Sequence, residues 1–288
     1  MRKLIILALV FALPASAQDL ATTVKATEAA AGIYMLEGVD GFSSNIGLMV
    51  GDEHVLLIDN GMAPITASLV AKVKELSGRS VDFIVNTHAH GDHVGSNATL
   101  AADGALIFAH DNLRNALLDN IDYAGGETGL PVVTFSDQVS FHANGHRAFV
   151  FHVPAAHTDG DSVIYFPDQN VIDASDLFFN SLFPYIDIDG GGSVAGFKAG
   201  QQRILDLADD ETVIIPGHGA MGNKADLQVA LDMLVDAEAR VKKLLDAGMS
   251  EEQILAANPL EDYHEKWNWG FITTERMTKT LYRSLTDG

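Results

Sequence analysis

The sequence of 288 residues contains no cysteine. Disulfides, thiolate zinc sites, iron–sulfur clusters and cysteine nucleophiles are therefore excluded. Basic residues are also few, because 18 lysines and arginines stand against 39 aspartates and glutamates, a formal net charge of −21. A surface of that charge repels nucleic acids and anionic membranes, so neither is expected as a partner. The hydrophobic fraction of 47% is typical of a globular protein and excludes extensive disorder.

The first 17 residues have the three parts of a secretory signal peptide. Arg2 and Lys3 are basic, Leu4 to Leu13 is apolar, and Ala15-Ser16-Ala17 is a small-residue cleavage site. The apolar run is too short to cross a bilayer, and no cysteine follows it to carry a lipid anchor. The alternative is a buried N-terminal helix. We expect cleavage before Gln18 and a periplasmic or secreted protein without a membrane anchor.

Apolar periodicity predicts strands first and then strands alternating with helices. Strands are expected at 32–36, 46–50, 54–58, 81–85, 105–109, several times between 132 and 166, and at 171–172 and 213–215. Helices are expected at 63–76, from 92 or 93 to 102, at 111–118 with Asp111 as the cap, and at 194–207, 224–245, 251–256 and 273–285. This order predicts an α/β fold of buried sheets covered by helices. We expect one main domain over 18–222 and a helical extension over 223–288 that packs on it.

The segment 87–95, THAHGDHVG, carries four ligand-type side chains within six residues. His88 and His90 are two apart on expected extended backbone, so their rings can point to one side. A turn at Gly91 brings Asp92 and His93 to the same place. Imidazole nitrogen and carboxylate oxygen suit zinc, with iron or manganese as alternatives. The alternative interpretation is that these residues form the polar, solvent-exposed first turn of a helix, but such a cluster rarely arises by chance.

Three further candidates, His157, Asp176 and His218, each follow an apolar strand-like run. Ligands commonly sit on loops at the ends of strands in α/β proteins. Taken alone, a histidine is more often a hydrogen-bonded structural residue than a ligand. Together with the first cluster, the set supplies five histidines and two aspartates. That is enough for two metals with a position left open for water.

These motifs, in this order, resemble the metallo-β-lactamase-fold superfamily of metallohydrolases. The resemblance runs from about Gly32 to Gly219 and rests on LIDNG at 57–61, HxHxDH at 88–93, His157, Ser175-Asp176, and PGHG at 216–219. It implies an αβ/βα four-layer sandwich with the metals at one edge between two sheets. It also implies two ligand sets: His88, His90 and His157 for one metal, and Asp92, His93 and His218 for the second, with Asp176 bridging them. Asp59 is expected to have a structural role.

The resemblance implies a dinuclear zinc hydrolase of a small-molecule carbonyl compound, such as a lactone, ester, thioester or β-lactam. Two dications lower the pKa of a bound water towards ~7, so that hydroxide can attack the carbonyl. Asp92 is the candidate catalytic residue, since it can orient that nucleophile and take its proton. Three alternatives remain: a metallo-β-lactamase that degrades antibiotics, a mononuclear iron enzyme like the persulfide dioxygenases, and a non-catalytic zinc-binding protein.

Substrate contacts are less clearly marked in the sequence. Asp176 stands where one β-lactamase subclass has a cysteine, and Phe179 where that subclass has a lysine for the drug carboxylate. Asp176 looks instead like the bridging carboxylate of glyoxalase II and the lactonases, yet the tail lacks an obvious basic glutathione site. Between Val81 and Phe197 only two residues are basic, against fifteen acidic ones. Candidate substrate-binding residues are Phe42, Phe179 and Tyr185. The alternative for Phe42 is the tip of a hairpin, and the alternative for Phe179 and Tyr185 is a position in the core.

Overall fold

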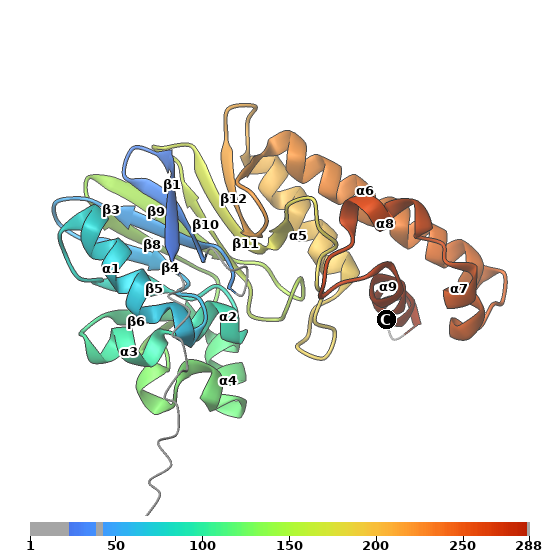
Figure 1. Cartoon of the computed structure of the whole chain (residues 1–288), viewed down its shortest axis with the longest axis horizontal. Coiled ribbons are helices and arrows are strands. Elements are labelled where there is room, and N and C mark those ends of the chain that lie inside the picture. Colours follow the sequence, from blue (N-terminus) through green and yellow to red (C-terminus); the bar gives the residue numbers. More distant parts are fainter. Residues whose placement is uncertain (1–22, 39–42, 287–288) are drawn as a thin grey trace, which may run out of the picture.

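The structure, a computed structural model, describes residues 23–38 and 43–286 (Figure 1). The expected signal peptide and Phe42 lie outside the described residues. The first of two sheets has the order β1-β2-β3-β4-β5-β6-β7. Its strands are antiparallel from β1 to β4 and parallel from β4 to β7. Their bounds are Val24–Ala30, Ile33–Gly38, Ile46–Val50, Val55–Ile58, Phe83–Val85, Leu106–His110 and Val133–Phe135.

The second sheet has the order β13-β12-β11-β10-β9-β8. All neighbouring strands are antiparallel except β11 and β12, which are parallel. In chain order from β8 to β13 the bounds are Gln138–Ala143, His146–His152, Ser162–Phe166, Val171–Phe179, Val213–His218 and Gly222–Asn223. The parallel pair matters for function, because β11 and β12 bring two of the predicted ligands to the same edge.

The alternation of buried side chains along β3 and β4 explains why two layers of core form. Leu48 and Leu57 point to one face, where they pack with Leu69 and Val73 of the first helix. Met49 and Leu56 point to the other face, where they pack with the second sheet. Because side chains of a strand alternate between faces, strands that are apolar throughout must be covered on both sides.

Helices cover the outer face of each sheet, as Figure 1 shows. Helix α1 lies on the first sheet, and α5 and α6 pack against β11 of the second. The α-helices α1 to α9 span Thr66–Ser77, Gly91–Val94, Asn97–Ala102, Asp111–Asp119, Val194–Leu207, Lys224–Asp246, Glu251–Ala257, His264–Trp267 and Thr274–Thr286. Short 3₁₀ turns η1 to η4 span Ala63–Ile65, Ile121–Ala124, Glu127–Gly129 and Glu261–Tyr263. The helix–sheet–sheet–helix order confirms the predicted four-layer sandwich.

The helices after residue 223 share the core of the second sheet. Trp267, Ile272 and Met277 belong to the same buried cluster as Phe178 on β11 and Phe197 on α5. The segment 223–286 is therefore joined to the sandwich by apolar packing; the domain boundaries themselves stay a prediction. Among the residues that the structure describes, no helix is long and apolar enough to cross a bilayer.

Some local predictions were wrong, each for a physical reason. The helix expected from 92 or 93 to 102 divides into α2 and α3, because Asn60 donates its N–H to the carbonyl of His93 and accepts from the N–H of Ser96. The cap of α4 is His110, whose Nδ1 accepts from the Asn112 N–H, rather than Asp111. Asp111 instead accepts from the Ser136 hydroxyl. Strand β1 was not predicted.

Candidate metal centre

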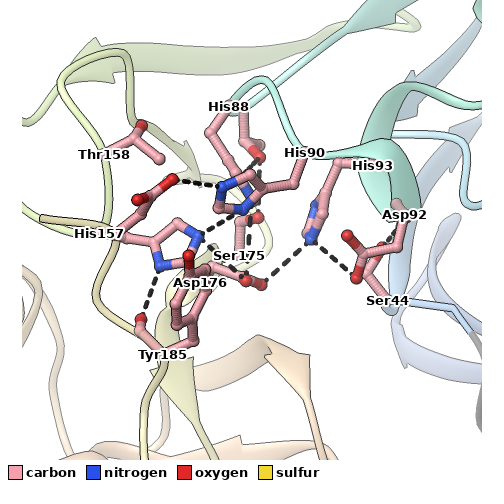
Figure 2. A network of polar contacts seen from close by, with 12 residues as sticks. Ser44, His88, His90, Asp92, His93, His157, Thr158, Ser175, Asp176 and Tyr185 are labelled. Carbon is pink, nitrogen blue, oxygen red and sulfur yellow. Dashed lines mark hydrogen bonds and ion pairs between the residues drawn. The ribbon is translucent and has the colours of Figure 1, made fainter. Parts of the chain in front are cut away.

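The seven predicted ligands converge at one edge of the sandwich. Figure 2 labels all of them except His218. His88 and His90 follow β5, and Asp92 and His93 lie in α2. His157 lies between β9 and β10, Asp176 lies within β11, and His218 ends β12. Asp176 was expected where a strand ends, but β11 continues to Phe179 through an irregularity at Ser175, where φ is 44° and the register with β12 shifts.

His88, His90, His157 and Asp176 form the first ligand group. One ligand atom from each lies within 4.8 Å of the others. Nε2 of His157 lies 3.0 Å from Nδ1 of His90 and 3.3 Å from Oδ2 of Asp176. Nε2 of His88 lies 3.8 Å from the same Oδ2. Three imidazole nitrogens therefore face one carboxylate oxygen.

Asp92, His93 and His218 form the second group. Oδ2 of Asp92 lies 3.4 Å from Nε2 of His218 and 3.7 Å from Nε2 of His93. Oδ1 of Asp176 lies 3.2 Å from Nε2 of His93 and 3.6 Å from Nε2 of His218. Asp176 thus presents one oxygen to each group, which is the arrangement of a bridging carboxylate.

Buried atoms without partners test whether this site fits metal ions. Within the described part of the chain, Nε2 of His88, Nε2 of His93 and Oδ1 of Asp176 are buried and make no hydrogen bond. A buried polar atom left unsatisfied costs about 1–3 kcal/mol. All three atoms are of ligand type and point into the site, so a cation would satisfy them. The donor set of imidazole and carboxylate fits zinc and does not exclude iron or manganese.

Hydrogen bonds on the far side of each ring select the nitrogen that faces the site. Nδ1 of His93 lies 2.7 Å from Oδ2 of Asp59, and Nδ1 of His157 lies 2.7 Å from the Tyr185 carbonyl. Both rings must donate there, which leaves Nε2 as a free ligand atom. Asp59 also accepts from the N–H and hydroxyl of Thr87. These bonds agree with its expected structural role, although Asp59, His88 and His93 also lie close enough to form a third group.

Sequence reasoning missed Asp187. Its Oδ2 lies 3.0 Å from Nε2 of His90, so the remaining nitrogen, Nδ1, faces His157. The hydrogen bond to His90 lowers the pKa of Asp187 to about 2, against the opposing effect of burial. Asp187 sits in the segment IDIDGGG, in which Asp189 is an equally plausible candidate by sequence alone. Only the fold distinguishes the two.

The two ligand groups differ in electrostatics. Burial and neighbouring histidines lower the pKa of His88, and burial lowers the pKa of His157 to about 4. Burial would also lower the pKa of His93 and of His218, but nearby carboxylates, Asp176 first, outweigh it. They hold the pKa of His93 well above its usual value and raise that of His218 to about 9.

The carboxylates of the site stay ionised. Burial alone would raise the pKa of Asp92, but the charge of His93 and a hydrogen bond from His218 lower it to about 2. The charges of His93, His218 and His157 likewise outweigh burial at Asp176 and hold its pKa well below the usual value. Both residues are therefore anionic at neutral pH and available to a cation.

The predicted substrate residues lie close to the histidines but in different settings. Phe179 stacks on His218 with ring centroids 5.0 Å apart and is only 2% exposed, which leaves little surface for a substrate. Tyr185 is partly exposed and its ring lies 5.6 Å from that of His90. Two further aromatic residues, Trp269 and Phe271, were not predicted to lie here.

The two-sheet sandwich and the cluster of His and Asp side chains at its edge place this chain in the class of αβ/βα proteins with a metal site. Comparison with protein families narrows this class: the chain belongs to the metallo-β-lactamase superfamily, whose model matches residues 39–218. Members of this superfamily are typically hydrolases. The resemblance inferred from the motifs is confirmed.

Individual relatives are distant. The chain is 30% identical to a hydroxyacylglutathione hydrolase of Pelagibacter ubique over 120 residues, 41% of this chain and 44% of that protein. It is 22% identical to a metallo-beta-lactamase type 2 of Bacillus cereus over 170 residues, 59% of this chain and 64% of that protein. The chain thus spans less than two thirds of each relative. A metallo-beta-lactamase structure from Pontibacter korlensis matches with a TM-score of 0.63 at 20% identity, over 74% of this chain and 100% of that one, which shows the fold alone.

Proposed function

We propose that the protein is a dinuclear zinc hydrolase that opens a carbonyl compound, with esters, thioesters and lactones as the first substrate classes. The observation that carries the proposal is Asp176, whose two oxygens face two separate histidine groups. A mononuclear iron centre in the first group would leave the second group, Asp92, His93 and His218, unused. Two ions would satisfy the buried ligand atoms of His88, His93 and Asp176 that make no hydrogen bond.

The chain's own residues divide the work. His88, His90 and His157 would hold one ion, Asp92, His93 and His218 the other, and Asp176 would bridge them. When bound, two zinc ions supply Lewis acidity that activates water and polarises a carbonyl. The depressed pKa of Asp92 keeps it ionised at neutral pH, so it can accept a hydrogen bond from the attacking water and orient it. The Ser44 hydroxyl donates to the Asp92 carbonyl at 2.6 Å and holds α2 in place.

A metallo-β-lactamase is the second candidate. The relative from Bacillus cereus and the shared fold favour it. Against it stands Phe179, buried against His218 at the position where one β-lactamase subclass has a lysine that binds the drug carboxylate.

We also propose export to the periplasm or beyond, on the signal-peptide pattern of residues 1–17.

The proposal is tested with the mature chain, loaded with zinc and assayed on an activated ester, a thioester, a lactone and a chromogenic cephalosporin. We expect kcat/KM of at least about 10⁴ M⁻¹s⁻¹ on one of the first three. Activity should vanish with a chelator and return with zinc. Hydrolysis that survives complete metal removal, or no hydrolysis of any of the four, would contradict it.

A further inference from the structure

Residues 268–272, between α8 and α9, bring two aromatic side chains to the metal centre from the far end of the chain. The ring of Trp269 lies 5.7 Å from that of His218 and 6.1 Å from that of Phe179. Phe271 lies 5.7 Å from Trp269 and 5.3 Å from Tyr185. Because Tyr185 lies 5.6 Å from His90, the three rings connect the two ligand groups along one side.

These rings are held in place by specific contacts. The indole N–H of Trp269 donates to the Phe183 carbonyl at 2.9 Å. The guanidinium of Arg276 donates to the Phe271 carbonyl at 3.0 Å and lies 4.0 Å from the ring of Phe271 and 5.2 Å from that of Tyr185. A ligand that binds such pre-arranged rings loses little affinity to ordering them.

Exposure distinguishes these rings from ordinary core. Phe271 is 48% exposed, and Trp269 and Tyr185 are partly exposed, whereas Phe179 behind them is 2% exposed. A cluster of partly exposed aromatic rings beside convergent polar ligands is typical of a small-molecule site. The three rings adjoin the metal centre, since Trp269 contacts His218 and Tyr185 contacts His90.

We infer that Tyr185, Trp269 and Phe271 form an aromatic wall that binds a planar, apolar group of the substrate next to the carbonyl held at the metal centre. The preferred substrates are then aryl-bearing carbonyl compounds rather than short-chain ones. This inference rests on the proposed function for its carbonyl group. Its test nevertheless needs no hydrolysis, because binding at the metal centre can be measured with an inert ligand.

The test compares benzohydroxamate with acetohydroxamate, two metal-chelating probes that differ in the aryl group, by calorimetry on the zinc-loaded protein. We expect the wild type to bind benzohydroxamate at least about tenfold more tightly. Trp269→Ala and Phe271→Ala should each remove most of that preference and change acetohydroxamate affinity by less than about twofold. Val229→Ala, which truncates an exposed side chain on α6, is the matched control and should preserve the preference.

A second readout uses the fluorescence of Trp269. The chain has two tryptophans, so Trp267→Phe leaves Trp269 as the only one. Benzohydroxamate should quench it at concentrations that match the calorimetric affinity. Equal binding of the two probes by the wild type, or equal loss of both in Trp269→Ala, would overturn the inference. A protein that prefers benzohydroxamate yet hydrolyses no carbonyl compound would keep the wall and contradict only the proposed function.

Discussion

Asp187 and His90 form a hydrogen-bonded pair in which the carboxylate lies 3.0 Å from Nε2. On the opposite side of the same ring, Nδ1 lies 3.0 Å from Nε2 of His157. An ionised carboxylate can only accept, so Nε2 of His90 must donate and Nδ1 keeps its lone pair for the metal. Asp187 is in turn fixed by the Gly190 N–H, which donates to its Oδ1 at 3.0 Å. Asp187 therefore determines which nitrogen of His90 faces the metal centre, without facing that centre itself.

Removing this carboxylate should weaken metal binding without unfolding the protein. We expect Asp187→Ala to lower zinc affinity about 10- to 100-fold, as for other partners of metal-bound histidines. Asp187→Asn should be no better, because its amide can donate to Nε2 and shift the ring proton onto Nδ1. Zinc titrations against a competing chelator measure this. Asp189→Ala, two residues on and paired with Arg283, is the control, and an equal loss there would refute the specific role of Asp187.

Gly217 makes room for the bridging carboxylate. A Cβ at this position would clash with Oδ1 of Asp176 and lie 2.8 Å from its backbone nitrogen. We expect Gly217→Ala to displace Asp176 and lower the affinity for both metals by more than tenfold. Gly270→Ala meets no heavy atom within 4 Å and should leave affinity unchanged. Wild-type metal content in Gly217→Ala after dialysis against a chelator would count against the bridging position.

The two ligand groups should release different numbers of protons when they bind zinc. A ligand histidine must be neutral. The pKa of His218 is about 9 and that of His93 is raised, so both carry a proton at pH 7 that zinc must displace. The pKa of His157 is about 4 and that of His88 is lowered, so both are already neutral. The affinity of the Asp92–His93–His218 group for zinc should therefore fall as the pH drops from 9.

Variants that keep one group each make this measurable. His157→Ala retains the Asp92–His93–His218 group, and His218→Ala retains the His88–His90–His157 group. At pH 7 we expect His157→Ala to release about one to two more protons per zinc than His218→Ala. Calorimetric titrations in two buffers of different ionisation enthalpy give the number. Equal proton release by the two variants would contradict the electrostatic difference between the groups.

We expect kcat/KM for a β-lactam to be lower than kcat/KM for a simple ester, thioester or lactone. Without a lysine at position 179, a β-lactam carboxylate loses a charge-assisted hydrogen bond worth ~1.5–3 kcal/mol, roughly a factor of ten to 150 in kcat/KM. The second metal could supply part of that binding. A chromogenic cephalosporin is compared with activated esters, thioesters and lactones on the same preparation. A cephalosporin value near 10⁶ M⁻¹s⁻¹, within the range of proficient enzymes, would reverse the ranking of the two candidate functions.

The parts of the site that are local in sequence could be predicted. His88 to His93 lie within six residues, and the buried strands β3 and β4 have continuous apolar runs. His157, Asp176 and His218 could be proposed from their positions after apolar runs, but their grouping came from the family resemblance. Asp187 and Trp269 could not be found, because each contacts a partner 86 or more positions away with no periodic pattern between them.

Strand β1 escaped prediction for a different reason. Of the residues Val24–Ala30, only Val24 is buried. The strand exists because its backbone pairs with β2, and an edge strand needs no apolar alternation to do so. The division of α2 from α3 likewise depends on Asn60, which lies 36 positions before Ser96.

Metal content is the most direct test of the two-metal site. Elemental analysis of the purified chain from Gln18 to Gly288 should give two zinc ions per chain. His88→Ala and His218→Ala should each retain about one, with hydrolysis reduced by orders of magnitude and the fold intact by circular dichroism. One iron per chain, or two zinc ions retained with full activity in either variant, would contradict the account.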